Sequence, residues 1–150
     1  MIEKELIMKY SKATNYALHT MVYLAHTTLE NTLGVKELAE RFQVSSTYLS
    51  KVLTTLVKAG LIESVSGVKG GYKLARSSET ITFLDVVQAV EGANPLFVCG
   101  MNATPAHNEK ICLIENAMKE AEQKMEADLA TKTIAGVARQ MKSLKEEMKK

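Results

Sequence analysis

Short polar side chains and a cation crowd one stretch of the chain, at positions 45–51. Hydroxyls, a phenol and an ammonium are groups that hydrogen-bond base edges and phosphates. Aliphatic residues at 49, 52, 53 and 56 follow helical spacing, so the polar residues would occupy the first turns of an amphipathic helix. They suit either nucleic-acid recognition or a capped, solvated helix end. The candidate residues are Ser45, Ser46, Thr47, Tyr48, Ser50 and Lys51.

A second candidate segment, 66–71, is rich in glycine and contains one lysine. It separates two runs with strand propensity, 61–65 and 72–75, which predicts a β-hairpin. Glycine permits positive φ in the turn and lets backbone approach a phosphate closely. Gly67, Val68 and Lys69 would form the tip of this hairpin.

The charge of the chain is concentrated around these two segments. The net charge is only +2, yet residues 41–76 contain six basic residues and one acid, a local charge of +5. Residues 81–150 contain nine basic and ten acidic residues. Affinity for nucleic acid comes from a local basic patch, so the low overall charge does not exclude such a partner. A solvated basic face is the alternative interpretation.

The two cysteines, Cys99 and Cys112, are the only other residues with distinctive chemistry. They are too few for a disulfide scaffold and form no Cys-x-x-Cys pair. Cys112 lies near a predicted helix N-terminus and beside Lys110, both of which favour a thiolate. The pair could therefore act as a redox switch. The alternative is structural, with Cys112 in a packed core and Cys99 incidental.

The elements that would position these residues are mostly helices. Apolar spacing predicts helices at 11–28, with Ser11 as N-cap, and at 35–42 and 46–59, the last ended by Gly60. Two short helices joined by a tight turn at 42–44 and followed by the hairpin predict a winged helix-turn-helix, with 45–59 as recognition helix and 66–71 as wing. A helix at 81–91 has a capping box, Thr82 with Asp85.

The C-terminal third is predicted to consist of two helices, at about 109–128 and from 133 onward. Each has a narrow apolar seam, which needs a partner inside the chain or in a second copy. A two-fold dimer would place two recognition helices about one DNA turn apart. The sequence therefore predicts three regions: a winged domain at 1–92, a sensor loop at 93–108 and a helical dimerisation region at 109–150. The expected dimer contacts are Ile111, Ile114, Met118, Ala121 and Met125.

The sequence resembles the Rrf2 family of bacterial winged-helix regulators over residues 9 to about 135. The resemblance rests on segments 11–18, 44–49, 53–62 and 67–74, and on Glu91 with Gly92. It implies a homodimeric, cytoplasmic regulator, usually a repressor, that binds a pseudo-palindromic DNA operator. It implies DNA contacts by Thr47, Tyr48 and Ser50 and by the wing tip, Gly67 and Val68. The wing departs from the family, because Ser66 stands where several relatives have arginine.

Many relatives in this family hold an iron–sulfur cluster with three cysteines before the dimerisation helix. Cys99 resembles the first and Cys112 the third, but residues 102–106 contain no middle cysteine. A cluster takes about four ligands, and Cys99, Cys112 and His107 would supply three, with Glu115 or a partner residue as the fourth. The prediction is that the chain holds no cofactor and no metal.

Other classes of function find no support in the sequence. No apolar run reaches the roughly 18 residues that span a bilayer, which predicts a cytoplasmic protein with no membrane partner. No phosphate loop, paired carboxylates or Ser-His-Asp pattern is present, so no enzyme activity is predicted. The prediction is a mainly α protein with a small β wing that regulates transcription. The alternative is a winged-helix module that binds proteins without specific DNA contact.

Overall fold

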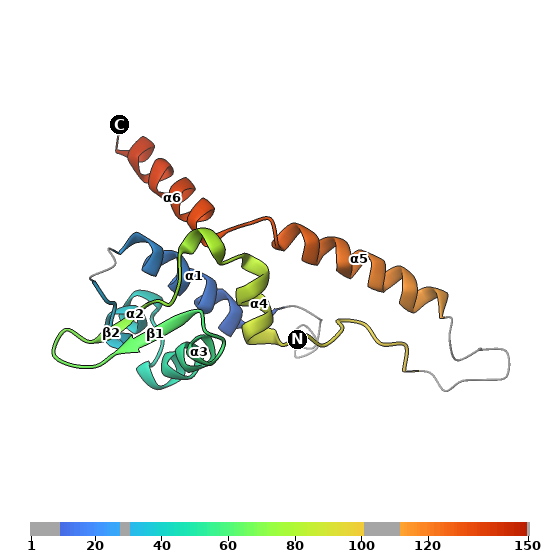
Figure 1. The fold of residues 1–150 in the computed structure, drawn as a ribbon, viewed down its shortest axis with the longest axis horizontal. Coiled ribbons are helices and arrows are strands. Elements are labelled where there is room, and N and C mark those ends of the chain that lie inside the picture. The colour runs from blue at the N-terminus through green and yellow to red at the C-terminus, as the bar shows by residue number, and fades with distance from the viewer. Residues whose placement is uncertain (1–9, 28–30, 101–111, 150) are drawn as a thin grey trace.

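The computed structural model describes residues 10–27, 31–100 and 112–149 (Figure 1). A winged domain contains α1 (Lys12–His26), α2 (Val35–Phe42), α3 (Ser46–Lys58), a hairpin of β1 (Ile62–Val65) and β2 (Gly71–Leu74), a short 3-10 turn η2 (Ser78–Thr80), and α4 (Phe83–Glu91). Two further helices, α5 (Leu113–Leu129) and α6 (Ile134–Met148), follow. The predicted fold class, mainly α with a two-stranded wing, is confirmed.

The core forms where α1 crosses the other helices. Its centre consists of fully buried side chains from α1, α2, α3 and α4, including Met21, Leu38, Leu53 and Val86. The apolar spacing of the sequence predicted these faces, because residues three and four apart share one side of a helix. Burial of this core sets the angle at which α2 and α3 cross α1.

The turn between α2 and α3 has the predicted length. Gln43 adopts left-handed geometry with φ of 57°, and the Val44 amide donates to the Ala39 carbonyl oxygen at 3.0 Å. At the other end of α3, Gly60 has φ of 75°, and the Leu61 amide donates to the Leu56 carbonyl oxygen at 3.1 Å. The backbone hydrogen bonds at the ends of α2 and α3 thus pair carbonyl oxygens that a helix terminus would otherwise leave without a donor.

The hairpin pairs its strands antiparallel, with Ile62 opposite Leu74 and Val65 opposite Gly71. A third segment braces it: Leu33 forms a bridge with Tyr72, with N–O distances of 3.0 and 2.8 Å. The Thr32 hydroxyl donates to the Lys69 carbonyl oxygen at 2.8 Å. The wing is therefore attached to the segment between α1 and α2 as well as to its own partner strand.

The capping box predicted at the start of α4 is confirmed. The Asp85 amide donates to Thr82 Oγ1 at 3.1 Å, and the Thr82 amide donates to Asp85 Oδ2 at 2.9 Å. Ser11 is the N-cap residue of α1, as predicted, but its side chain does not make the cap. Ser11 has N-cap backbone geometry but no side-chain cap hydrogen bond, and its hydroxyl donates to Glu91 Oε1 instead, at 2.8 Å.

The two C-terminal helices differ in how they contact the domain. In α6, Ile134, Ala135 and Ala138 are buried against α1, and the Ile134 amide donates to the Ile81 carbonyl oxygen at 2.9 Å. The first half of α6 thus packs into the core of the winged domain. By contrast α5 has no buried residue and extends away from the domain (Figure 1).

None of the helices within the described ranges combines the length and apolar character that crossing a membrane requires.

Candidate nucleic-acid interface

Helix α3, predicted as the recognition helix, presents a polar face opposite its buried one. Ser45 is the N-cap, and its hydroxyl accepts from the Tyr48 amide at 3.1 Å. Leu49, Val52, Leu53 and Leu56 are buried. Thr47 and Lys51 are exposed and Ser46 and Ser50 half-buried, so all six predicted residues of this segment lie on the first turns of one helix.

Two residues that the sequence analysis did not select extend this face. Thr54 and Lys58 are exposed and continue the spacing of Thr47 and Lys51 along α3. The Thr54 hydroxyl donates to the Ser50 carbonyl oxygen at 2.8 Å. Helical periodicity applied to the polar residues, as it was to the apolar ones, would have found both.

Four contacting aromatic rings connect the start of α3 to α1: those of Tyr48, Tyr16, Phe42 and Tyr23. The Tyr48 ring is 38% exposed and meets the Tyr16 ring edge-on, with centroids 5.9 Å apart. Tyr16 also stacks on Phe42 at 5.5 Å, and Phe42 on Tyr23 at 5.8 Å. Such ring pairs restrict side-chain rotation, so Tyr48 is held in one orientation while its outer edge stays accessible.

The wing projects beyond the domain. Val68 at its tip is fully exposed, and Lys69 beside it is also exposed. Gly67 has φ of 110°, a value that L side chains rarely adopt. A Cβ on Gly70 would collide with the carbonyl oxygen of Val65. The three predicted tip residues, Gly67, Val68 and Lys69, therefore lie together at the exposed end of the hairpin.

Ion pairs neutralise some of the basic side chains in the positively charged window at 41–76. Lys73 pairs with Glu63, N–O distance 3.2 Å. Arg76 pairs with Asp85, from outside the basic window, also at 3.2 Å. Arg41 lies 3.5 Å from Glu37 and over the Tyr23 ring at 5.2 Å.

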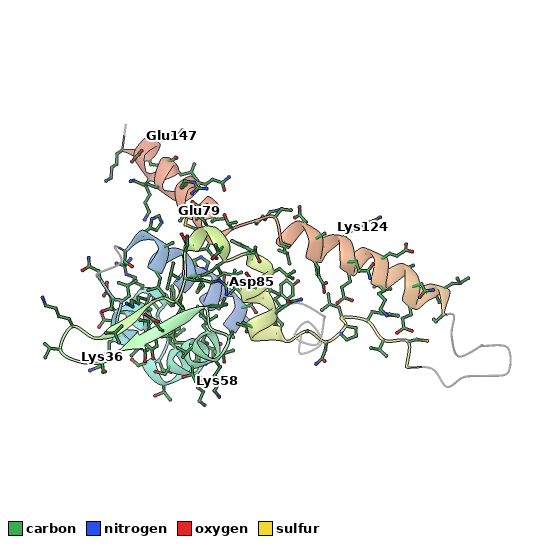
Figure 2. The ribbon with its side chains drawn as sticks, viewed as in Figure 1. Lys36, Lys58, Glu79, Asp85, Lys124 and Glu147 are labelled. Carbon is green, nitrogen blue, oxygen red and sulfur yellow. The ribbon has the colours of Figure 1, made fainter. Side chains whose placement is uncertain are left out.

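The exposed cations on α3 are Lys51 and Lys58, and the wing adds Lys69. In Figure 2, Lys36 and Lys58 lie along one edge of the winged domain, whereas Glu79 and Glu147 lie on the opposite side.

The cysteines lie at the two borders of a segment outside the described residues. Cys99 is half-buried with a free thiol. Cys112 is the N-cap of α5, and its Sγ accepts from the Glu115 amide at 3.4 Å. Ile111 and His107 fall outside the described residues.

The predicted dimer residues on α5 share one face of the helix but differ in exposure along it. Ile114 and Met118 are 69% and 46% exposed, and Ala121 is exposed as well. Met125 instead turns toward its own domain, where its Sδ accepts from the Tyr10 hydroxyl at 3.6 Å.

Glu91 accepts several hydrogen bonds, although the sequence pointed to it only as part of the family motif with Gly92. Its Oε1 accepts from the Ser11 amide at 2.6 Å, the Ser11 hydroxyl at 2.8 Å and the Thr14 hydroxyl at 2.7 Å. Burial alone would raise the pKa of this carboxyl, but the hydrogen bonds from Thr14 and Ser11 outweigh it and lower the pKa. The ionised carboxylate lies at the N-terminus of α1, where the helix dipole favours negative charge.

Comparison with known proteins identifies the family to which this fold belongs. Residues 10–140 match the model of the Rrf2 family, described as an iron-dependent transcriptional regulator. The chain belongs to the Rrf2 family. This Rrf2 protein is 35% identical to YwgB of Bacillus subtilis over 118 residues, 78% of this chain and 76% of the relative. It is 32% identical to the protein rrf2 of Nitratidesulfovibrio vulgaris over 132 residues, 88% of each chain.

Solved structures of Rrf2-type regulators share the fold. The chain matches CymR, the global cysteine regulator of B. subtilis, with TM-score 0.65 and 28% identity, covering 89% of this chain and 98% of CymR. It matches IscR of T. potens with TM-score 0.72 and 25% identity, covering 91% and 90%. Members of the family are DNA-binding transcription regulators and not enzymes, and this chain is one of them.

The family description raises the question of iron. A cysteine-held cluster takes about four ligands, whereas the whole chain has two cysteines. No group of three His, Cys, Asp or Glu side chains converges among residues 10–27, 31–100 and 112–149. Cys112 is also engaged as a helix cap. The absence of a cluster therefore stays a prediction from the number of cysteines in the chain.

Proposed function

We propose that this Rrf2-family protein is a homodimeric repressor that binds a specific, pseudo-palindromic operator through α3 and the wing. The observation that carries the proposal is the exposed polar face of α3, together with an exposed cation at the wing tip. Tyr48 and Lys51 of α3 would enter the major groove. Lys58 and Lys69 would neutralise phosphates on either side.

Binding to DNA can be tested by fluorescence anisotropy on the upstream region of the protein's own gene. The double variant Tyr48→Ala, Lys51→Ala should lose discrimination between this region and random DNA while its circular dichroism is unchanged. Lys124→Ala, an exposed cation on α5, serves as the matched control and should bind as the wild type does. Unaltered affinity of the double variant would remove α3 from the assignment.

The salt dependence of binding separates phosphate contacts from base contacts. Each lysine that neutralises one phosphate contributes about 0.9 to the slope of log K against log salt. Lys69→Ala should therefore lower that slope by about one unit while leaving sequence preference intact. No DNA binding at any salt concentration would favour the alternative, a protein-interaction module.

The dimer part of the proposal rests on the exposed N-terminal part of the apolar face of α5. Ile114, Met118 and Ala121 form an exposed apolar stripe on a helix that has no buried residue. A second copy related by a two-fold axis would cover the stripe. Sedimentation should show Ile114→Glu, Met118→Glu as a monomer. Asn116→Glu, Gln123→Glu adds the same two charges to the other side of α5 and should remain a dimer.

We further propose that the segment between Cys99 and Cys112 responds to oxidants. Two thiols would lose two protons and two electrons to hydrogen peroxide, giving one disulfide and two waters. Cys112 would then give up its cap on α5, which would shift the arm. In support, the chain is similar to Staphylococcus aureus CymR, of which an oxidised form has been solved, with TM-score 0.69 and 27% identity. If Cys99→Ser releases DNA on peroxide treatment as the wild type does, the switch is refuted.

A further inference from the structure

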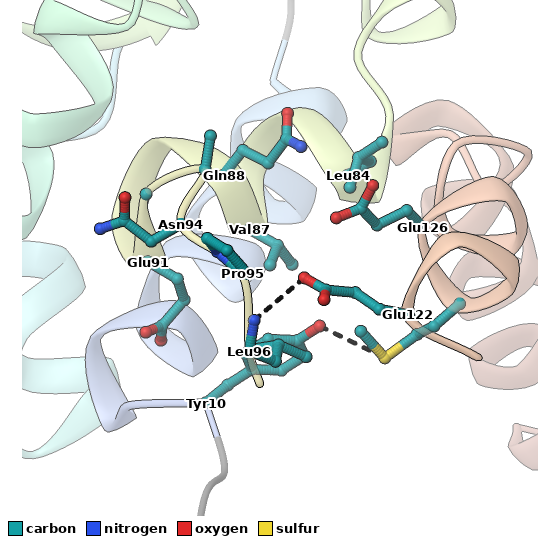
Figure 3. A pocket seen from close by; sticks show the side chains of 13 residues that line it. Tyr10, Leu84, Val87, Gln88, Glu91, Asn94, Pro95, Leu96, Glu122 and Glu126 are labelled. Carbon is teal, nitrogen blue, oxygen red and sulfur yellow. Dashed lines mark hydrogen bonds between the residues drawn. The ribbon is translucent and has the colours of Figure 1, made fainter. Parts of the chain in front are cut away.

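A pocket lies where the winged domain meets the α5 arm (Figure 3). One wall comes from α4 and the residues 92–96 that follow it, a second from Tyr10 ahead of α1, and a third from α5. The cavity has a volume of about 490 Å³. That volume is within the range of pockets that enclose a small organic molecule.

The walls of the pocket are largely apolar. Leu84 and Val87 of α4, Pro95 and Leu96 of the following segment, and Met125 of α5 line it. Figure 3 shows the Leu96 and Tyr10 side chains between α1 and α5. Removing an aliphatic or aromatic body from water against such walls stabilises a complex by roughly 25 cal/mol per Å².

The charged groups around this cavity all have one sign. Glu91, Glu122 and Glu126 line it, and no basic side chain from the described part of the chain does. The structure anchors two of them: Glu91 through the hydrogen bonds from Ser11 and Thr14, and Glu122 by accepting from the Leu96 amide at 3.1 Å. Both carboxylates are thus fixed at the cavity rather than free to swing into solvent.

The pKa of Tyr10 reflects the negative charge around the cavity. Burial raises the pKa of Tyr10, and the carboxylates of Glu91, Glu126 and Glu122 raise it further. Three negative charges acting on one phenol indicate a negative potential inside the cavity. A negatively charged ligand would be repelled there, and a neutral one would gain nothing from the charges.

We propose that this pocket binds a small hydrophobic cation, an amine or quaternary ammonium with an aliphatic or aromatic body. The body would occupy the apolar walls and the ammonium would lie between the carboxylates. The face of the Tyr10 ring offers a further attraction for a cation. This site is separate from the α3 and wing surface and from the two cysteines, neither of which lines it.

The position of the pocket suggests what binding would do. Its walls belong to both the winged domain and α5, so a ligand between them would change how firmly the arm is held. This consequence rests on the proposed function, because it matters for DNA only if α5 joins two copies. Binding itself does not depend on that proposal.

The experiment uses the full chain without DNA, labelled with ¹³C at the methionine methyl groups. The Met125 resonance is assigned by its loss in Met125→Leu. Benzyltrimethylammonium is compared with phenylacetate, an anion with a similar ring, and with benzyl alcohol, a neutral one. The cation should shift the Met125 resonance in a saturable way below about 10 mM, a range that covers the affinity expected of so small a ligand. The anion should leave the resonance unchanged.

Variants test the carboxylates. Glu122→Gln, Glu126→Gln should weaken the cation's affinity about ten-fold, since two of the three charges around the cavity are lost. Glu120→Gln, on an exposed position of α5 outside the lining, should bind as the wild type does. Gln88→Trp should fill the cavity and abolish the shift while leaving the dichroism spectrum intact.

Two results would overturn the proposal: no shift of Met125 with the cation, or equal shifts with cation and anion. Either can occur whether or not the protein binds its operator, so failure here is distinguishable from failure of the proposed function.

Discussion

Replacing Glu91 by alanine should destabilise the winged domain, because one carboxylate oxygen accepts three hydrogen bonds at the start of α1. Hydrogen bonds to a charged group contribute about 1.5–3 kcal/mol, and loss of a helix cap costs about 0.5–2 kcal/mol. The three bonds share one acceptor and are not additive, so we expect a loss of about 2 kcal/mol in all. For a chain of this size that corresponds to about 4–8 °C in Tm.

The assay is urea and thermal unfolding followed by circular dichroism at one chain concentration, because dimerisation would make stability concentration-dependent. Glu120→Ala, an exposed α5 position, should stay within about 0.5 kcal/mol of the wild type. Glu91→Gln keeps an acceptor oxygen but not the charge, and should fall between the wild type and Glu91→Ala.

The pH dependence gives an independent check on the same carboxylate. The folded-state pKa of Glu91 is lower than the ordinary value of 4.5, so ionisation stabilises the fold. That stabilisation is fully present above the unfolded pKa and is lost as pH falls through the folded pKa. The stability difference between wild type and Glu91→Gln should therefore shrink in acid. A loss under about 0.5 kcal/mol for Glu91→Ala, or a difference that grows in acid, would refute the stabilising role of the Glu91 hydrogen bonds at the start of α1.

Three other outcomes are expected. Gln43→Gly should raise the free energy of unfolding by about 0.5 kcal/mol, because glycine adopts the left-handed turn without strain at some entropic cost; a loss of stability in urea titration would contradict this. Gly70→Ala should destabilise the wing by about 1–3 kcal/mol, since its Cβ meets the Val65 carbonyl. Ser66→Ala, at an exposed position of the same hairpin turn, is the control, and amide hydrogen exchange in β1 and β2 is the measurement. Protein purified without oxygen should be colourless, and a brown preparation with stoichiometric iron would contradict the argument from two cysteines.

Local signals in the sequence predicted the parts of the fold that depend on neighbouring residues. The Thr82–Asp85 capping box, the end of α3 at Gly60 and the turn at 42–44 all follow from residues within one helical turn of each other. The family resemblance, carried by the recognition helix and hairpin motifs, is confirmed by the match over residues 10–140. The individual DNA contacts remain predictions.

Residues far apart in the chain account for what the sequence analysis missed. Nothing near Ser11 indicates that the acceptor for its hydroxyl lies 80 residues later. The apolar seam of the last helix is equally compatible with a partner inside or outside the chain, and only packing shows that Ile134 is buried on α1. The charge count included Arg76, but its pairing with Asp85 becomes visible only after folding.

The sequence by itself determined the periodic faces, the caps, the turn chemistry and the placement of polar residues at the start of α3. These follow from short-range sterics and hydrogen bonding, which depend on residue types a few positions apart. The tertiary structure decided which faces meet, which cations remain exposed on α3 and the wing and where three carboxylates surround one apolar cavity. Those features arise because burial brings together side chains that no local pattern connects, and the free energy of desolvation and charge depends on that three-dimensional neighbourhood.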